Sequence, residues 1–320
     1  MATDIQPNLA EAYLAARRKS KWKQVSINWE LYLLALLPVA WIIIFRYIPM
    51  YGAQIAFRRF VPAMGIWGSR WVGFDHFIRF FNSYNFGNIM FNTLFLNLYS
   101  LVAGFPIPIV LAVFIHYCPN FGFKKTVQMV TYAPHFISVV VMVGIIFKMF
   151  AMRNGIVNVA IRGLGFEEVN FLGTASAFPH VYVWTGIWQT MGFGTIIYLA
   201  ALSGVSPELH DSAKADGANM WQRIWHVDIP GIAPTVIILL ILRTGRLLEV
   251  GFEKVLLMQN NLNLRAAEVI QTYVYKVGLA SSNPNFSYAA AIGLFRSVIS
   301  FTLLILVNRL ARKIGETSLW

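Results

Sequence analysis

The segment SGVSPELHDSAKADGANMWQRIWHVDIP, residues 203–230, interrupts a chain that consists mainly of long apolar stretches. It carries charges of both signs, a central glycine and two tryptophans. The segment is too polar to cross a membrane, and its apolar residues are too regularly spaced for an irregular loop. Its meaning therefore depends on the sequence around it.

The first half of this segment has the features of a short helix that ends at a glycine. Ser206 is a favourable N-cap, and Pro207 suits the first helical position. Glu208 follows in the first turn, where the helix dipole stabilises an anion. We predict that the helix runs to about Asp216 and that the chain turns at Gly217, because glycine adopts a positive φ without steric strain.

The second half predicts another short helix, which starts near Asn219. Trp221, Ile224 and Trp225 are spaced so that they share one apolar face of this helix. Pro230 is then expected to mark the start of the next apolar stretch. Two helices that meet at a glycine corner suit docking into a groove on another protein. A hairpin that lies on the membrane surface is the alternative.

The composition indicates that the lipid bilayer is the solvent for this chain. Of the 320 residues, 57% are hydrophobic and 12% are charged, whereas soluble domains carry about 25% charged residues. Six apolar segments are close to the ~20 residues that a helix needs to span the hydrocarbon. They are residues 31–48, 89–115, 127–150, 181–202, 231–252 and 288–310, and GFPIP interrupts the second. Because lipid offers no partners to an open strand, we predict an all-α integral membrane protein with about six transmembrane helices.

Positive charge predicts the orientation of these spans. Lys and Arg number 26 against 14 Asp and Glu, an excess that we attribute to cytoplasmic loops and not to nucleic-acid binding. The dense clusters are Arg17, Arg18, Lys19, Lys21 and Lys23, then Lys124 and Lys125, and finally Arg309, Arg312 and Lys313. With an even number of spans, these clusters fall on one side, so both termini and segment 203–230 are predicted to be cytoplasmic. The first outer loop is an exception, with Arg58, Arg59, Arg70 and Arg79.

The chain divides into a tail and one membrane domain. Residues 1–30 are predicted to be a basic cytoplasmic tail, which either lies as a short helix on anionic headgroups or is solvated. No cleavable signal peptide is expected, since the first 23 residues lack an apolar core. Residues 31–320 are expected to form the transmembrane domain. Because Cys118 is the single cysteine of the chain, no internal disulfide is possible.

The polar segment resembles the EAA loop of binding-protein-dependent ABC importer permeases. The family pattern is E-A-A-x-x-x-G, then nine residues, then I-x-L-P. The positions that carry the resemblance here are Asp211, Ser212, Ala213, Asp216, Gly217, Ala218, Val227, Ile229 and Pro230. Asp211 replaces Glu, Ser212 replaces Ala, Val227 replaces Ile and Ile229 replaces Leu, and all four replacements are conservative. The motif is long and its spacing is fixed, so the resemblance is specific.

Further stretches resemble the carbohydrate-uptake branch of this family, especially permeases for oligosaccharides and fragments of polysaccharides such as alginate. These stretches are YIPMYGAQIAFRRF, GIWGSRWVGFDHF, YAPHFIS, GFEKVLLMQN and SYAAAIGLFRSVI. They cover most of the chain beyond residue 30. The resemblance implies a type I importer permease in the bacterial inner membrane, and thus a transporter subunit and not an enzyme.

The resemblance also implies partners. Two permease subunits, commonly two different chains, form the pore; two ATPase subunits sit beneath; and an extracytoplasmic solute-binding protein delivers the sugar. The chain has no G-x-x-x-x-G-K-[ST] phosphate loop, so no cofactor is expected in it and the ATPase subunits are expected to bind ATP and Mg²⁺. The residues implied in ATPase coupling are Asp211, Ser212, Ala213, Asp216, Gly217, Ala218 and Pro230.

Candidate substrate-pathway residues lie in the fourth and fifth apolar segments. Arg243, Arg246 and Glu249 are spaced i, i+3 and i+6, so successive members are neighbours along a helix. They either form an internal ion-pair set or line a pore with net positive charge, which favours a uronate over a neutral sugar. Trp188 and Gln189 offer an aromatic surface and an amide to a sugar.

Two other classes of protein are alternatives to a permease. A membrane enzyme that acts on lipid-linked sugars needs an acid–base or metal cluster, and the sequence presents none. A secondary transporter is expected to contain an internal repeat and paired broken helices. GFPIP has the composition of a helix break, but no matching segment occurs in the other half.

Overall fold

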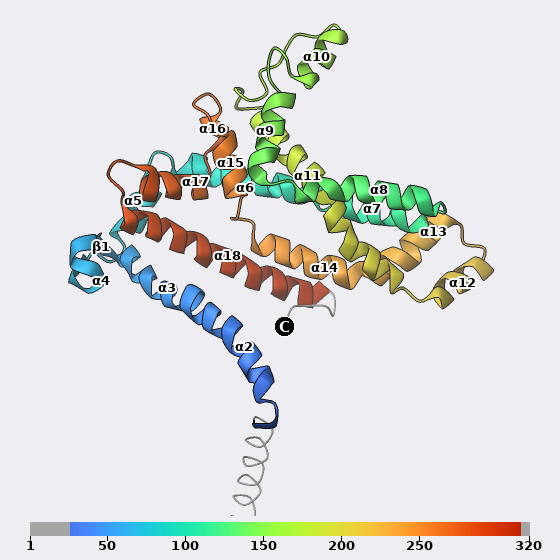
Figure 1. The fold of residues 1–320 in the computed structure, drawn as a ribbon, viewed down its shortest axis with the longest axis horizontal. Coiled ribbons are helices and arrows are strands. Elements are labelled where there is room, and N and C mark those ends of the chain that lie inside the picture. The colour runs from blue at the N-terminus through green and yellow to red at the C-terminus, as the bar shows by residue number, and fades with distance from the viewer. Residues whose placement is uncertain (1–25, 315–320) are drawn as a thin grey trace, which may run out of the picture.

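A computed structural model describes residues 26–314 (Figure 1). The longer helices are α2 (Trp29–Ile42), α6 (Phe86–Gly104), α7 (Pro106–Tyr117), α8 (Phe121–Tyr132), α9 (Val139–Met149), α11 (Phe178–Ser203), α14 (Ile229–Gly245) and α18 (Phe286–Ile314). The shorter ones are α3 (Ile48–Met50), α4 (Gly65–Gly68), α5 (Asp75–Phe81), α10 (Ile156–Gly163), α12 (Pro207–Ala215), α13 (Met220–Arg223), α15 (Phe252–Met258), α16 (Leu264–Ala267) and α17 (Ile270–Tyr275). Most of the predicted tail, residues 1–25, lies outside the described residues, with the basic cluster 17–23.

The described helices confirm a multi-span membrane fold. Four continuous helices are long and apolar enough to cross a bilayer: Trp29–Phe57, Phe86–Tyr117, Met220–Gly245 and Phe286–Lys313. Two bent pairs bring the number to as many as six. The first pair, Phe121–Phe136 with Val139–Met149, bends by 104°, and the second, Phe178–Ser203 with Pro207–Ala215, bends by 69°. The prediction of about six apolar spans is therefore confirmed.

The third predicted span, residues 127–150, is not straight. A 3-10 segment, Ala133–Phe136, follows α8 and contains Pro134. Ser138 then caps α9 by accepting a hydrogen bond from Val141 N at 3.4 Å. The chain changes direction here for two reasons. Pro134 cannot donate a backbone hydrogen bond to the helix, and Ser138, four residues later, caps a new helix. By contrast, GFPIP does not break the second span, because Phe105 keeps helical torsion angles between α6 and α7.

The fifth span is displaced from its predicted bounds of 231–252. It begins at Met220, runs through a π-helical turn, Ile224–Asp228, and ends at Gly245. Pro230 therefore lies inside a continuous helix and does not mark the start of the span. The widened π-helical turn directly precedes the proline, whose missing N–H would otherwise break the helix.

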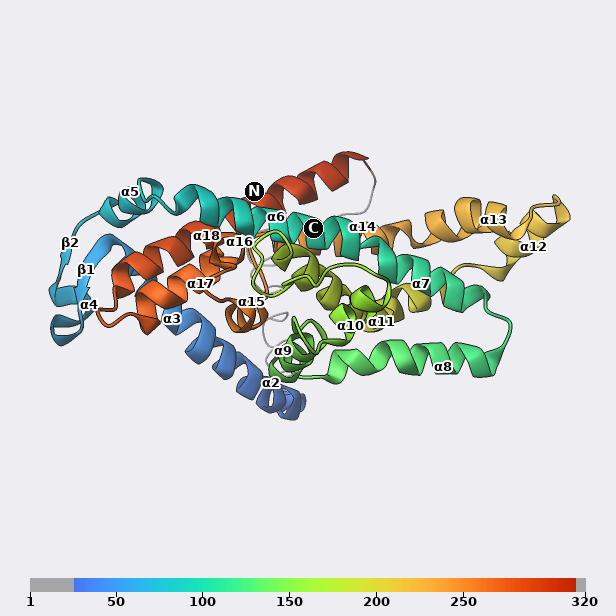
Figure 2. The same ribbon diagram turned by 90° about the horizontal axis from the view of Figure 1, so that it is seen from above.

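One small sheet departs from the all-α expectation. Strands β1 (Arg58–Val61) and β2 (Ser69–Trp71) pair antiparallel, with Arg58 opposite Trp71. The Arg58 guanidinium lies 5.4 Å from the ring centroids of both Trp67 and Trp71. This hairpin occupies one end of the long axis, and α12 and α13 occupy the other end (Figures 1 and 2).

Helix α11 lies at the centre of the packing. Its Phe178 and Val181 belong to a buried cluster with Met142 and Ile146 of α9 and Val255 of α15. A second cluster joins α5, α6, α17 and α18, and a third joins α7, α11 and α14. Helix α2 is different, because it contains no buried residue and stands away from the other helices (Figure 1). Its apolar surface is available to lipid or to another protein.

Candidate functional site

The polar segment folds into an elbow at one end of the molecule, which we define as residues 206–230 (Figure 1). Ser206 Oγ accepts a hydrogen bond from Glu208 N at 3.3 Å, and Pro207 opens α12 as predicted. Helix α12 ends at Ala215, and Gly217 has a φ of 80°. Ala218 N donates to Ala213 O at 2.8 Å across the turn, so the left-handed glycine closes the helix.

The second arm of the elbow begins with a capping box. Asn219 Oδ1 accepts from Gln222 N at 2.9 Å, and Gln222 Oε1 accepts from Asn219 N at 2.8 Å. Of the predicted apolar face, Ile224 is buried, while Trp221 and Trp225 are exposed. The two tryptophans line an apolar cleft of about 170 Å³ between this arm and α7.

Four of the seven predicted coupling residues line a hollow between the two arms. The hollow has a volume of about 270 Å³, and Ala213, Asp216, Gly217 and Ala218 contribute to its wall. The other three lie elsewhere. Asp211 and Ser212 are exposed on α12, where Asp211 pairs with Lys214 at 3.0 Å, and Pro230 lies within α14. The structure thus presents a polar concave surface at the tip of the molecule.

A second candidate site is a cavity of about 340 Å³ between α6, α11, α14 and the turn before α15. Its polar side chains are Ser100, Tyr182, Gln189, Thr190, Arg243 and Lys254. No Asp or Glu is among its lining residues, so the two cations have no carboxylate on this wall. Such a cavity offers a positive potential, to which the buried Lys254 and the exposed Arg243 both contribute.

Lys254 is the residue of this cavity that the sequence analysis missed. Its side chain is almost buried, with 8% exposed. Its Nζ donates to Tyr182 O at 3.0 Å and to Thr185 Oγ1 at 2.9 Å, and lies 5.0 Å from the Tyr182 ring centroid. Burial lowers the pKa of Lys254 to about 8. Its sequence context, FEKVLLM, offers one signal, since a lone lysine among apolar residues needs polar partners.

The predicted substrate-pathway residues divide into two groups. Arg243 and Gln189 line the cavity; the Arg243 guanidinium lies 5.6 Å from the Phe105 ring centroid, and Gln189 Nε2 donates to Ile137 O at 3.0 Å. Arg246, Glu249 and Trp188 are exposed and do not line this cavity.

The prediction that Arg243, Arg246 and Glu249 share one helix is wrong, because α14 ends at Gly245. Beyond this end, Arg246 N donates to Arg243 O at 3.1 Å and Glu249 N donates to Arg246 O at 2.8 Å, so the chain continues as turns. An Arg246–Glu249 ion pair does not occur among the ion pairs of residues 26–314.

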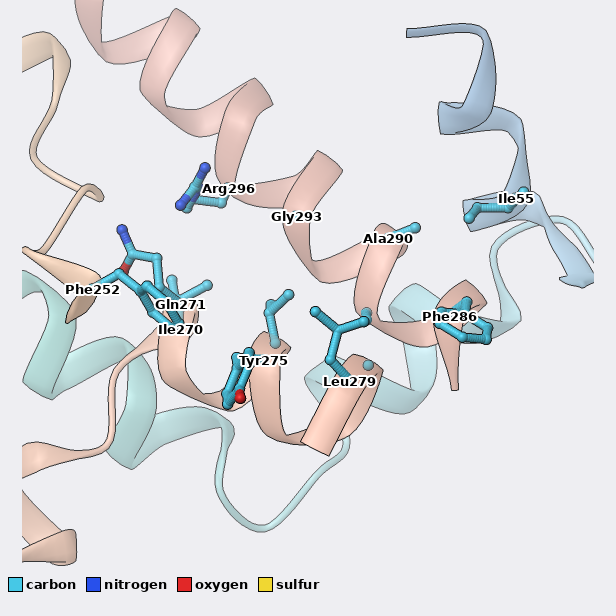
Figure 3. A pocket seen from close by; sticks show the side chains of 13 residues that line it. Ile55, Phe252, Ile270, Gln271, Tyr275, Leu279, Phe286, Ala290, Gly293 and Arg296 are labelled. Carbon is cyan, nitrogen blue, oxygen red and sulfur yellow. The ribbon is translucent and has the colours of Figure 1, made fainter. Parts of the chain in front are cut away.

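A larger cavity of about 650 Å³ has a different character. It lies between α17, α18 and the 3-10 segment Tyr51–Phe57, and most of its lining is apolar. Arg296 and Gln271 lie together at one end of it, whereas Ile55, Leu279 and Phe286 line the other (Figure 3). Because the hydroxyl groups of a sugar need hydrogen-bond partners, the smaller cavity, with its six polar side chains, fits a sugar better than this more apolar one.

Comparison with known proteins places these features in a family. The family described as "Binding-protein-dependent transport system inner membrane component" matches residues 80–316. The polygalacturonan/rhamnogalacturonan transport system permease protein YteP of Bacillus subtilis (strain 168) is 41% identical over 319 residues, which cover 99% of each chain. Protein LplB of the same strain is 38% identical over 309 residues, which cover 97% of this chain and 94% of LplB.

Solved structures give the same result. One is a bacterial alginate ABC transporter in complex with an alginate pentasaccharide-bound periplasmic protein. A chain of it superposes with a TM-score of 0.85 and 37% identity, over 93% of this chain and 99% of that chain. Another is a bacterial ABC transporter involved in the import of the acidic polysaccharide alginate, with a TM-score of 0.85, 38% identity and coverage of 92% and 99%.

Proposed function

This chain belongs to the family of binding-protein-dependent transport system inner membrane components, and we propose that it carries acidic oligosaccharides. It is a multi-pass inner-membrane protein with the type I permease fold, and it is a permease subunit of a sugar ABC importer. It is therefore a transporter subunit and not an enzyme in its own right.

One observation supports an acidic substrate most directly: the cavity with Arg243 and Lys254 has no carboxylate among its lining residues. Two like charges on the wall of one cavity repel, and an incoming carboxylate would offset that repulsion. A planar guanidinium also matches a carboxylate in a bidentate manner. Two of the similar proteins transport acidic polymers, polygalacturonan/rhamnogalacturonan in one case and the acidic polysaccharide alginate in the other, and their negative charge is complementary to this cavity.

We infer that the same cavity orients the sugar through its uncharged groups. Ser100, Thr190 and Gln189 supply hydroxyl and amide groups on its wall. Tyr182 supplies an aromatic ring, which is the type of surface on which a sugar ring stacks. A neighbouring part of the sugar pathway is proposed to include Arg246, Glu249 and Trp188, which are exposed and do not line this cavity.

The partner subunits are proposed from the family and from two features of the chain. Within the elbow 206–230, the residues proposed to contact an ATPase subunit are Asp211, Ser212, Ala213, Asp216, Gly217, Ala218 and Pro230, whereas His210 faces inward against the buried Asp228. Two ATPase subunits would bind ATP and Mg²⁺ and supply the energy. Helix α2, which contains no buried residue, has apolar surface to offer to lipid and to a second permease subunit, which we propose is a different chain. An extracytoplasmic solute-binding protein would deliver the sugar.

Both termini are proposed to be cytoplasmic, on the same side as the elbow. The positive-inside pattern supports this orientation, since Lys124 and Lys125 lie in the first turns of α8 and Arg312 and Lys313 lie in the last turn of α18.

Transport into proteoliposomes tests the proposal. The permease, its partner permease, the ATPase subunits and the solute-binding protein are reconstituted together, and ATP-driven uptake is measured for uronic and neutral oligosaccharides of equal length. We expect uptake of the uronic sugars to exceed that of the neutral ones. Equal uptake of both, or a preference for the neutral sugars, would contradict an acidic substrate while leaving the permease role intact.

A further inference from the structure

Asp228 is a fully buried carboxylate at the root of the elbow. Its exposed fraction is 0%, and it ends the π-helical turn that leads into α14. A charge removed from water is costly unless partners compensate it, so the groups around Asp228 are informative.

Two side chains from distant parts of the chain meet this carboxylate. Tyr117, the last residue of α7, donates its hydroxyl hydrogen to Asp228 Oδ2 at 2.6 Å. His210, in the middle of α12, places Nε2 at 3.2 Å from Asp228 Oδ1. We call this set of three residues the clasp. It joins α7, the first arm of the elbow and the start of α14.

The clasp is the polar side-chain contact that holds α12 to the membrane helices. Helix α12 contains no buried residue. Within the described part of the chain, its other side-chain ion pair, Asp211 with Lys214, is internal to α12 and exposed. Besides the chain connections at its two ends, α12 is therefore linked to α7 and α14 through His210.

Two buried polar atoms at the clasp have no hydrogen-bond partner among the described residues. Asp228 Oδ1 is buried and lacks an aligned hydrogen bond despite its contact with His210. Arg223 Nε is also buried without a hydrogen-bond partner, and its guanidinium lies 5.9 Å from the Tyr117 ring centroid. A buried network with one open acceptor and one open donor gains free energy when a small shift completes it.

We propose that His210, Asp228 and Tyr117 are positioning residues that convert movement of the elbow into movement of α7 and α14. This proposal rests on the proposed contact between the elbow and an ATPase subunit. The clasp would not touch nucleotide or sugar. It would set how much of the force on α12 reaches the helices that surround the sugar cavity, since Arg243 lies near the far end of α14.

The test uses the full transporter in proteoliposomes with His210→Leu, Asp228→Asn and the double variant. Sugar uptake per ATP hydrolysed is measured together with basal ATP hydrolysis and co-purification of the ATPase subunits. We expect each single variant to keep its ATPase subunits and basal hydrolysis while uptake per ATP falls by about fivefold, a size typical of coupled residues. Since the residues act as one unit, uptake per ATP in the double variant should be no lower than in the more strongly affected single variant.

A control separates this effect from a general loss of ion pairs. Glu268→Gln breaks the 3.1 Å pair with Lys276, which is remote from the elbow, and should leave uptake per ATP unchanged. The proposed role of the clasp would be contradicted if His210→Leu kept normal uptake per ATP. It would also be contradicted if the fold-losses of the two single variants multiplied in the double variant. Failure of the unaltered chain to retain ATPase subunits would instead contradict the proposed function.

Discussion

Lys254 and Arg243 lie on the wall of one cavity although they come from different elements, α15 and α14. The turns between Gly245 and Phe252 fold back and bring the two cations to the same space. Lys254 is fixed by Tyr182 and Thr185, so its charge is held in place and not free to leave for water. The fixed lysine and the exposed Arg243 on the same wall are the basis of the expected preference for acidic sugars.

Arg243→Gln should lower uptake of uronic oligosaccharides by about tenfold, since a hydrogen bond to a charged group contributes about 1.5–3 kcal/mol. Uptake of any neutral sugar that the transporter accepts should change little. Initial rates of uptake into proteoliposomes give both values. Arg296→Gln is a matched control, because Arg296 lines the larger apolar cavity and not this one. Equal losses for both variants would argue against the cavity as the sugar pathway.

The pH dependence of uptake should report the protonation of Lys254. Burial lowers the pKa of Lys254 to about 8, so the side chain is charged below this pH and neutral above it. Uptake of uronic sugars should therefore fall as the pH rises through about 8, where the cavity loses one positive charge. Lys254→Arg should remove this alkaline fall, because arginine stays charged. An unchanged pH profile in Lys254→Arg would exclude Lys254 as its source.

Gly217→Asp should separate ATP hydrolysis from transport. The φ of 80° at Gly217 is unfavourable for other residues, by roughly 1–2 kcal/mol, although no atom lies within 4 Å of an added Cβ. The free-energy cost therefore arises in the backbone of the turn at Gly217, so the membrane-spanning helices should still insert. The readout is stimulation of ATP hydrolysis by loaded binding protein, which should be lost. Gly144→Ala in α9, with equal open space and no positive φ, should keep normal stimulation.

The contact between α8 and α11 should be sensitive to a single methyl group. An added Cβ at Gly192 would overlap Thr131 O and C, which are backbone atoms that have no freedom to move aside. Gly192→Ala should therefore destabilise the protein by about 1–3 kcal/mol or more, as overpacking does. Gly194→Ala, whose added Cβ would lie 3.4 Å from Pro108, is the matched control on the same helix. The melting temperature in detergent should fall for the first variant and stay close to the original for the second.

Much of the fold could be predicted because it depends on local features. Apolar segments of spanning length indicated the membrane helices, and Ser206, Pro207 and Gly217 marked the bounds of the elbow through their own torsion angles and caps. These signals need only neighbouring residues. The elbow was therefore predicted with its helix start, its corner and its second arm.

The remaining features depend on contacts between residues far apart in sequence. The end of α14 at Gly245, which removed Arg246 and Glu249 from the helix, coincides with a close approach of that glycine to Leu304 of α18. Lys254 acquires its role from Tyr182, 72 residues earlier. Hydrophobic periodicity carries no information about such pairings.

The most direct test of the central claim pairs an acidic oligosaccharide with its carboxyl-reduced counterpart of the same length. Uptake of both is measured for the unaltered transporter and for the Arg243→Gln, Lys254→Gln double variant. We expect the unaltered transporter to prefer the acidic sugar by at least about tenfold and the double variant to show little preference. A preference that survives removal of both cations would contradict the claim that this cavity selects the substrate.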